Sequence, residues 1–157
     1  MEERPLIQPG SEPDYPVVIA GAGPVGLSLA LGLSCRGIRS LVLEKKEALS
    51  PHSRALLVTV RTLEILRAWG ALDRFLEEGT FLPGVQVWVV GREAPPFTFD
   101  FSCLGDATPV RGVVVMPQDV TEALLLEQVR QRGLAEVRFG EEVTGFRQDE
   151  TGVSSVR

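Results

Sequence analysis

The sequence predicts an α/β fold in which a strand, a helix and a second strand form a parallel sheet, with an antiparallel β segment inserted after it. Two short apolar runs, Val17–Ala20 and Ser40–Leu43, flank an apolar stretch of helical length. Beyond residue 80 the hydrophobic period changes from 3.6 to 2, which is typical of amphipathic strands. Together these observations favour a mixed fold over an all-helical or all-β one.

The first elements read as a buried βαβ unit. Val17–Ala20 is entirely apolar, so we expect a strand buried on both faces. Pro24–Arg36 is apolar almost all round and is followed by Gly37, which predicts a buried helix ending at that glycine. Ser40–Leu43 is the second strand, and Glu44 stands at its carboxyl end.

The middle of the chain combines two helices with amphipathic strands. The helices are expected at Thr59–Trp69 and Leu72–Glu77, and the strands at Val85–Val90 and Phe97–Phe101. Alternation puts Phe97, Phe99 and Phe101 on one face, either as part of a core or as the wall of a pocket for an aromatic ligand.

The last third predicts a strand, a helix, a strand and a hairpin. Asp119 at N-cap and Glu122 at N3 favour a helix that runs to Arg132. The strands are expected at Val113–Pro117, Glu136–Phe139, Val143–Arg147 and Val153–Val156, the last two forming the hairpin.

Composition excludes several classes of function. The net charge of −5 argues against a nucleic-acid surface, and one histidine with two cysteines provides no metal-ligand pattern. Residues 1–15 are polar and proline-rich, which predicts a disordered tail rather than a signal peptide. The longest apolar run, Val25–Leu33, is too short to span a membrane. From the two cysteines we expect a reduced, cytoplasmic protein.

A glycine motif follows the first strand directly. In GAGPVG, Gly21 suits a tight turn, Gly23 lets a pyrophosphate approach the backbone, and Gly26 lets the helix pack on the strand. Glu44 lies 23 residues after Gly21, where a carboxylate can accept the ribose hydroxyls of an adenosine. This pattern predicts a site for NAD or FAD and disfavours NADP, whose 2′-phosphate the carboxylate would repel.

Three segments resemble the FAD-dependent aromatic-ring hydroxylases, the flavin monooxygenases related to p-hydroxybenzoate and phenol hydroxylases. They are VVIAGAGPVGLSLALGLSCRGIRSLVLEKKE, PHSRALLVTVRTLEILRAWGALDRF and MPQDVTEALLLEQV. The resemblance implies a Rossmann-like FAD-binding sheet, with NADH or NADPH, O₂ and a small aromatic compound as partners of the complete enzyme. It also implies that residues 16–157 are the N-terminal part of the FAD-binding domain, with residues 80–117 starting the substrate-side sheet.

The resemblance also extends the predicted cofactor site. Arg54 matches an arginine that packs against the FAD phosphates and ribityl chain, and Gln118 matches a glutamine that contacts the ribityl chain. The predicted cofactor-binding residues are Gly21, Ala22, Gly23, Pro24, Val25, Gly26, Glu44, Lys45, Arg54 and Gln118. We assign no catalytic residue, and His52 is interpreted as a surface residue. Cys35 and Cys103 are interpreted as small, at least half-buried hydrophobes.

Two further motifs of the family, a D-G segment and a G-D segment, have no counterpart in these 157 residues. We therefore expect the fold to be incomplete at its C-terminus, with an open sheet edge through which the chain could self-associate. Two other interpretations stay open. One is a non-catalytic nucleotide-binding remnant, and the other is an NAD-dependent dehydrogenase domain.

Overall fold

The computed structural model describes residues 15–49, 57–91, 93–94, 97–150 and 152–156. The chain divides into two compact units. The first comprises residues 1–52 and 122–157, and the second comprises residues 53–121. In sequence, the second unit is thus inserted into the first.

The first unit contains a parallel three-stranded sheet. Its strands are β1 (Val17–Ala20), β2 (Ser40–Glu44) and β8 (Ala135–Phe139), in the order β1-β2-β8. In register, Val17 stands opposite Ser40 and Glu44 opposite Phe139. The predicted βαβ unit is confirmed. Because the strands are parallel, their carboxyl ends share one edge of the sheet, where Gly21 and Glu44 follow or end their strands.

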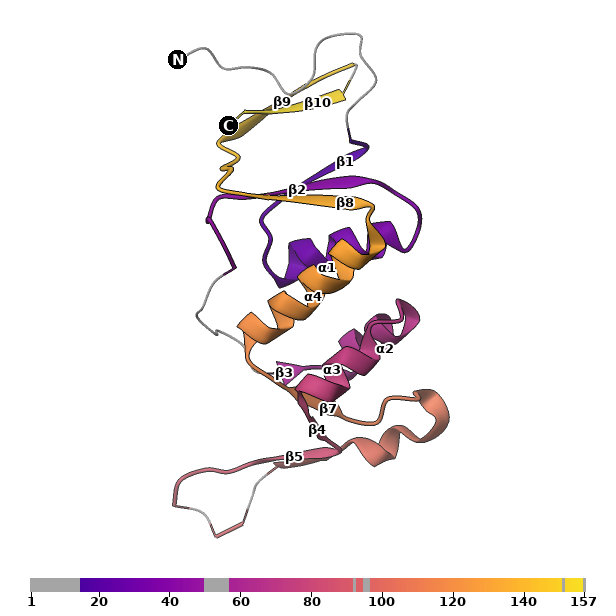
Figure 1. The fold of residues 1–157 in the computed structure, drawn as a ribbon. Helices are drawn as coiled ribbons and strands as arrows, with labels where there is room; N and C mark the ends of the chain where they lie inside the picture. Colours follow the sequence, from indigo (N-terminus) through magenta and orange to yellow (C-terminus); the bar gives the residue numbers. More distant parts are fainter. Residues whose placement is uncertain (1–14, 50–56, 92, 95–96, 151, 157) are drawn as a thin grey trace. The chain divides into compact units, whose positions relative to one another are not determined.

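Two helices cover one face of this sheet and a hairpin covers the other (Figure 1). The helices are α1 (Pro24–Ser34) and α4 (Gln118–Arg132), the latter lying in this unit from Glu122 onward. The hairpin pairs β9 (Gly145–Asp149) with β10 (Gly152–Val156) in antiparallel fashion, as predicted. Coverage on both faces explains why β2, the central strand, is buried along almost its whole length.

Two burial predictions for this unit were wrong in part. Val18 and Ala20 of β1 are exposed whereas Ile19 between them is buried, so one face of this strand is open to solvent among the described residues. On α1, Leu27 and Leu31 are fully buried, but Val25 is 83% exposed. The apolar composition of α1 therefore marks a helix with one solvent-facing side rather than one surrounded by protein.

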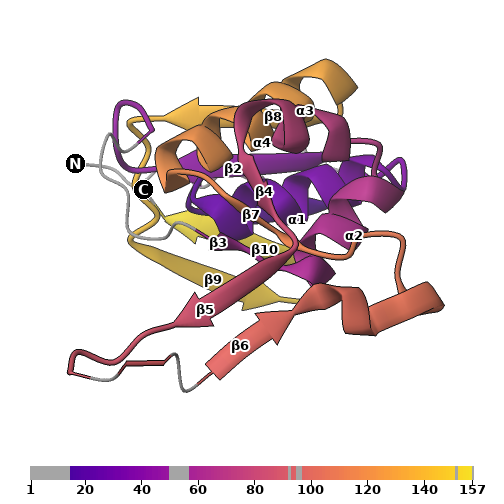
Figure 2. The same ribbon diagram turned by 90° about the horizontal axis from the view of Figure 1, so that it is seen from below.

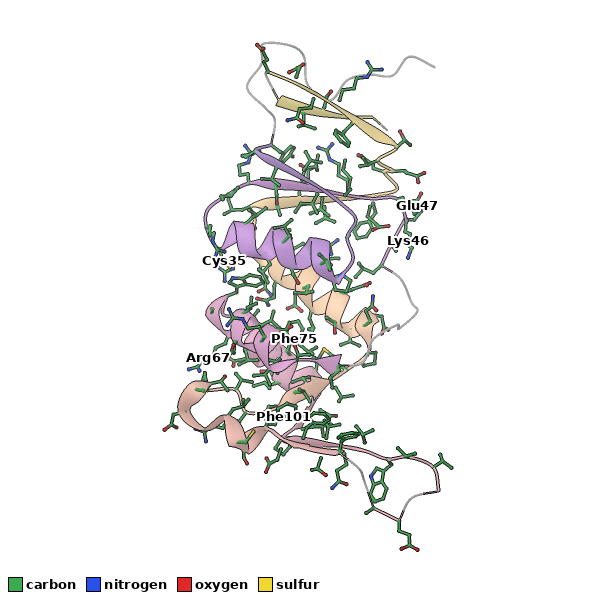
Figure 3. The ribbon with its side chains drawn as sticks, turned by 180° about the vertical axis from the view of Figure 1, so that it is seen from behind. Cys35, Lys46, Glu47, Arg67, Phe75 and Phe101 are labelled. Atoms are coloured by element: carbon green, nitrogen blue, oxygen red, sulfur yellow. The ribbon has the colours of Figure 1, made fainter. Side chains whose placement is uncertain are left out.

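The second unit is built on a small antiparallel sheet in the order β3-β7-β4. Its strands are β3 (Leu57–Val58), β7 (Val113–Val115) and β4 (Thr80–Leu82), and its helices are α2 (Val60–Ala68) and α3 (Leu72–Glu78). Both helices and β7 were predicted, whereas β3 and β4 were missed because strands of two or three residues show no alternation. Phe75 is the largest fully buried side chain and lies within this unit (Figure 3).

A two-stranded ribbon extends from the same unit (Figure 2). It pairs β5 (Gly84–Val87) with β6 (Phe97–Asp100), and a 3₁₀ helix, η1 (Phe101–Ala107), follows β6. The predicted antiparallel pairing is confirmed. Phe97 and Phe99 are 62% and 54% exposed, so the interpretation of this face as a core was wrong. The aromatic side chains stand instead on an open face of a ribbon with only two strands.

The predicted cap of α4 was also wrong. The helix begins at Gln118, and the Thr121 amide donates to the Pro117 carbonyl at 3.1 Å, which places Pro117 at N-cap. Asp119 and Glu122 therefore lie two residues too far inside the helix for reciprocal capping. Asp119 Oδ1 is instead buried, with no hydrogen-bond partner among the described residues.

A substitution at Gly112 tests the packing of the second unit. A Cβ atom at this position would overlap the Phe81 ring and lie 2.5 Å from the Leu82 carbonyl oxygen. We expect Gly112→Ala to lower the free energy of unfolding by roughly 1–3 kcal/mol, the usual cost of overpacking. Urea unfolding followed by circular dichroism measures this, with the exposed Thr98→Ala as a control that changes stability by less than about 0.5 kcal/mol. Equal stability of the two variants would contradict the packing.

Candidate nucleotide-binding site

The glycine loop connects the end of β1 to the start of α1. The Gly21 amide donates to the Leu43 carbonyl at 2.7 Å, which ties the loop to the neighbouring strand β2. Gly21 has a φ of 100°, a conformation that residues with a Cβ rarely adopt. The loop therefore turns immediately after the sheet edge and directs the backbone into the helix.

The close packing of α1 against the end of β1 requires a glycine at position 26. A Cβ at this position would overlap the Gly21 carbonyl oxygen and lie 3.3 Å from the Ile19 side chain. Because α1 passes this close to β1, only glycine fits at the contact. This confirms the reason for Gly26 that the sequence indicated.

Unlike Gly26, Gly23 has a backbone conformation and surroundings that would accept a side chain. Its φ of −76° and ψ of −177° suit any residue, and a Cβ built there meets no heavy atom of the described chain within 4 Å. Neither strain nor packing within the described chain explains a glycine here. The space beside its Cα is open, which is the property that a closely approaching ligand requires.

The start of α1 also has no side-chain cap among the described residues. Gly23 occupies the N-cap position, Pro24 has no amide hydrogen, and the first turn contains no acidic residue. The first intrahelical bond runs from the Leu27 amide to the Gly23 carbonyl at 3.0 Å. The amides of Val25 and Gly26 precede that bond and, with the positive end of the helix dipole, provide a binding place for an anion.

Glu44 connects β2 to the glycine loop. Its Oε2 accepts the Ala22 amide at 2.8 Å, and its Oε1 accepts the Lys46 amide at 3.0 Å. The carboxylate is half-buried at the carboxyl edge of the sheet. Since each carboxylate oxygen can accept about two hydrogen bonds, one acceptor position on each remains for a ribose hydroxyl.

The other predicted site residues are placed as follows. The Lys45 ammonium lies 3.8 Å from a Glu142 carboxylate oxygen, so this lysine interacts with the loop after β8. Gln118 is half-buried at the start of α4 in the second unit, and its relation to the glycine loop stays a prediction. Arg54 lies outside the described residues, as does His52. Cys35 is half-buried as expected, whereas Cys103 is exposed on η1.

Sequence reasoning missed the turn that follows β8. The Gly140 amide donates to the Lys46 carbonyl at 2.9 Å, and the Glu141 amide donates to the Glu44 carbonyl at 2.9 Å. Figure 3 shows Lys46 and Glu47 together on the loop after β2. These contacts involve backbone atoms, so residue type offers little signal. The only hint is a glycine directly after a strand.

A second polar cluster joins Tyr15, just before β1, to side chains of β8. The Tyr15 hydroxyl bonds to one carboxylate oxygen of Glu136, and Arg138 Nε donates to the other at 2.6 Å. The Arg39 guanidinium lies 5.3 Å from the centre of the Tyr15 ring. Hydrogen bonds from Arg138, and then from Tyr15, hold the pKa of Glu136 below its usual range. The pKa of Tyr15 is raised, mainly by its bond to Glu136.

The described part of the chain contains neither a metal-binding cluster nor a membrane-spanning helix. Within it, no group of three or more histidine, cysteine, aspartate or glutamate side chains could hold a metal ion. Within the same residues, no helix combines the length and the apolar character needed to cross a membrane.

The fold and the site together define a Rossmann-type dinucleotide-binding unit, with an open glycine loop, an uncapped helix start and a strand-end carboxylate. Residues 14–157 match the family described as FAD binding domain. The chain belongs to this family, and the predicted family and α/β fold class are confirmed.

Several relatives illustrate the match. The chain is 37% identical over 140 residues to a rifampicin monooxygenase of Streptomyces venezuelae. This match covers 89% of this chain and 28% of the monooxygenase. An anhydrotetracycline hydroxylase from Streptomyces rimosus matches with a TM-score of 0.77 and 39% identity, over 90% of this chain and 27% of that one. The p-nitrophenol 4-monooxygenase of Pseudomonas putida has a TM-score of 0.77 and 27% identity, over 88% and 38% of the two chains. The chain thus spans well under half the length of these relatives.

The two central glycines provide a matched pair of variants. Gly26→Ala should lower the free energy of unfolding by about 1–3 kcal/mol, because its Cβ would force α1 away from β1. Gly23→Ala should change it by less than about 1 kcal/mol, since the backbone there already suits alanine. Thermal unfolding of both variants without nucleotide makes the comparison. A Gly23 variant as unstable as the Gly26 variant would show that the loop packs against protein.

The Glu136 cluster predicts an acid-dependent contribution to stability. Because its pKa is lowered in the folded state, the carboxylate stabilises the fold above the usual carboxyl pKa, and this contribution is lost as pH falls through the lowered value. Urea midpoints measured from pH 6 down to acid should fall less for Glu136→Gln than for the unsubstituted chain. The two proteins should differ only slightly in how far their urea midpoints fall, since Glu136 is exposed and solvent screens its interactions. Parallel curves for the two proteins would contradict the prediction.

Proposed function

We propose that this chain is the cofactor-holding N-terminal part of a flavin monooxygenase that uses NADH or NADPH and O₂ to hydroxylate an aromatic compound. Membership of the FAD binding domain family supports the cofactor. The monooxygenases and hydroxylases among the relatives support the reaction class. The proposal concerns the complete protein, because the chain matches only 27–38% of the length of these relatives.

The observation that carries the proposal is the open space at Gly23. The protein explains Gly21 by its φ and Gly26 by its contact with β1, but the described chain supplies no neighbour that would exclude a side chain at Gly23. A pyrophosphate lying against the backbone gives that reason. The residues present therefore fit a dinucleotide.

Each part of the site has an assigned role in this proposal. The amides of Gly23, Val25 and Gly26 bind the pyrophosphate, and Glu44 accepts the hydroxyls of the adenosine ribose. Lys45 is assigned to the adenosine end of the cofactor. From the family resemblance, Arg54, which lies outside the described residues, and Gln118 are assigned to the ribityl chain. FAD, when bound, supplies the redox and oxygen chemistry, while the protein positions it and excludes water.

Further parts of the proposal concern the substrate, self-association and the location of the protein. The exposed face with Phe97 and Phe99 supports an aromatic substrate near the ribbon of the second unit. Val18 on the single-neighbour strand β1 supports association through that edge. The free thiols of Cys35 and Cys103 support a reducing, cytoplasmic location.

FAD binding by the purified chain tests the proposal. After incubation with FAD and desalting, we expect a retained flavin absorption band. We expect Glu44→Gln to raise the dissociation constant by about 10- to 100-fold, because the amide cannot accept from both backbone amides and both ribose hydroxyls. Glu77→Gln removes the same charge from α3 in the second unit and serves as the control, with unchanged affinity.

The outcomes separate the proposal from its rivals. Tight binding of NADH with no binding of FAD would favour the dehydrogenase interpretation. A folded chain that binds neither nucleotide would overturn the assignment of the glycine loop as a sufficient site. Retained FAD without oxidation of added NADH or NADPH would favour a non-catalytic, nucleotide-binding chain.

A further inference from the structure

We propose that the turn after β8, centred on Gly140, is a positioning element for the ribose-binding carboxylate of Glu44. The inference deepens the proposed function and rests on it. Gly140 lies 96 positions from Glu44 in sequence, and no site prediction included it. The structure nevertheless connects the two through a short series of backbone hydrogen bonds.

The connection passes through a single residue, Lys46. Its amide donates to Glu44 Oε1 at 3.0 Å, and its carbonyl accepts the Gly140 amide at 2.9 Å. The amide and the carbonyl of Lys46 belong to successive peptide units joined at its Cα, so the bond from Gly140 restrains the position of that Cα and limits how far the amide can move. The amide in turn fixes one oxygen of the carboxylate.

A second contact anchors the same region. The Glu141 amide donates to the backbone carbonyl of Glu44 at 2.9 Å, continuing the pairing of β2 with β8 beyond the strand ends. The other carboxylate oxygen is held by the Ala22 amide of the glycine loop at 2.8 Å. Glu44 is thus held from both sides, by the loop after β1 and by the turn after β8.

The turn depends on glycine at position 140. Gly140 has a φ of 76°, and a Cβ there would lie 3.0 Å and 3.1 Å from the two carboxylate oxygens of Glu47. A β-branched residue strongly disfavours this φ. Its backbone would relax toward negative φ, withdraw the amide from Lys46 and release the constraint on Glu44.

The test measures how much more tightly the chain binds ADP than 2′-deoxy-ADP. This ratio would not change if Gly140 served only the stability of the fold. We expect the unsubstituted chain to bind ADP about tenfold more tightly than 2′-deoxy-ADP, since the deoxy compound lacks one hydrogen bond to a charged group. Both affinities are measured by displacement of FAD fluorescence. Gly140→Val should reduce this ratio to about threefold or less, because the carboxylate is no longer held in place.

Gly133 provides a matched control. Its φ is 67°, and its amide donates to the Arg130 carbonyl at 3.1 Å, so Gly133→Val carries similar strain and loses a similar bond. It belongs to the connection before β8 and bonds to no residue of the site. Gly133→Val should leave the ADP to 2′-deoxy-ADP ratio unchanged. Gly140→Asn should retain most of the ratio, because asparagine tolerates positive φ.

The outcomes distinguish this inference from the proposed function. A chain that binds neither FAD nor ADP overturns the proposed function and the inference with it. A chain that binds both, and whose selectivity survives in Gly140→Val or falls equally in Gly133→Val, overturns the inference alone. Should the valine variant fail to fold, amide hydrogen exchange in the unsubstituted chain decides. Slow exchange of the Lys46 amide supports the proposal, and exchange at the unprotected rate refutes it.

Discussion

The close approach of α1 to β1 is the constraint on which the first unit depends. Gly26 lies where any side chain would overlap the carbonyl of Gly21, so the helix starts directly at the edge of the sheet. The start of this helix has no side-chain cap among the described residues, and the amides of its first turn precede the first intrahelical bond. A packing requirement within the protein thus creates the anion-binding geometry that the proposed cofactor site uses.

The carboxylate of Glu44 connects three separate segments of the chain. Glu44 ends the central strand, accepts an amide from the glycine loop, and is fixed through Lys46 by the turn after β8. These bonds use backbone amides, which are positioned by the sheet itself rather than by mobile side chains. A site assembled this way is largely formed before a nucleotide arrives, which reduces the ordering that binding requires.

Much of the fold could be predicted because local patterns and tertiary structure agree. The apolar strands of the parallel sheet, the helix after the glycine loop and the hairpin near the C-terminus all follow from periodicity and turn residues, although that helix ends at Ser34 rather than beside Gly37. The errors have a common cause. The burial of β1 and α1, the exposure of Phe97, and the helix start at Gln118 depend on which neighbours are present, and composition does not record neighbours.

The sequence by itself determined the identity of the glycine motif, the acidic residue at the end of β2 and the family to which both belong, because these signals lie within one contiguous βαβ segment. Tertiary structure alone decided that Gly26 serves packing while Gly23 faces open space. It also decided that the turn at Gly140 reaches Lys46. The physical reason is that such contacts join backbone atoms of distant segments, and every residue type carries the same backbone groups.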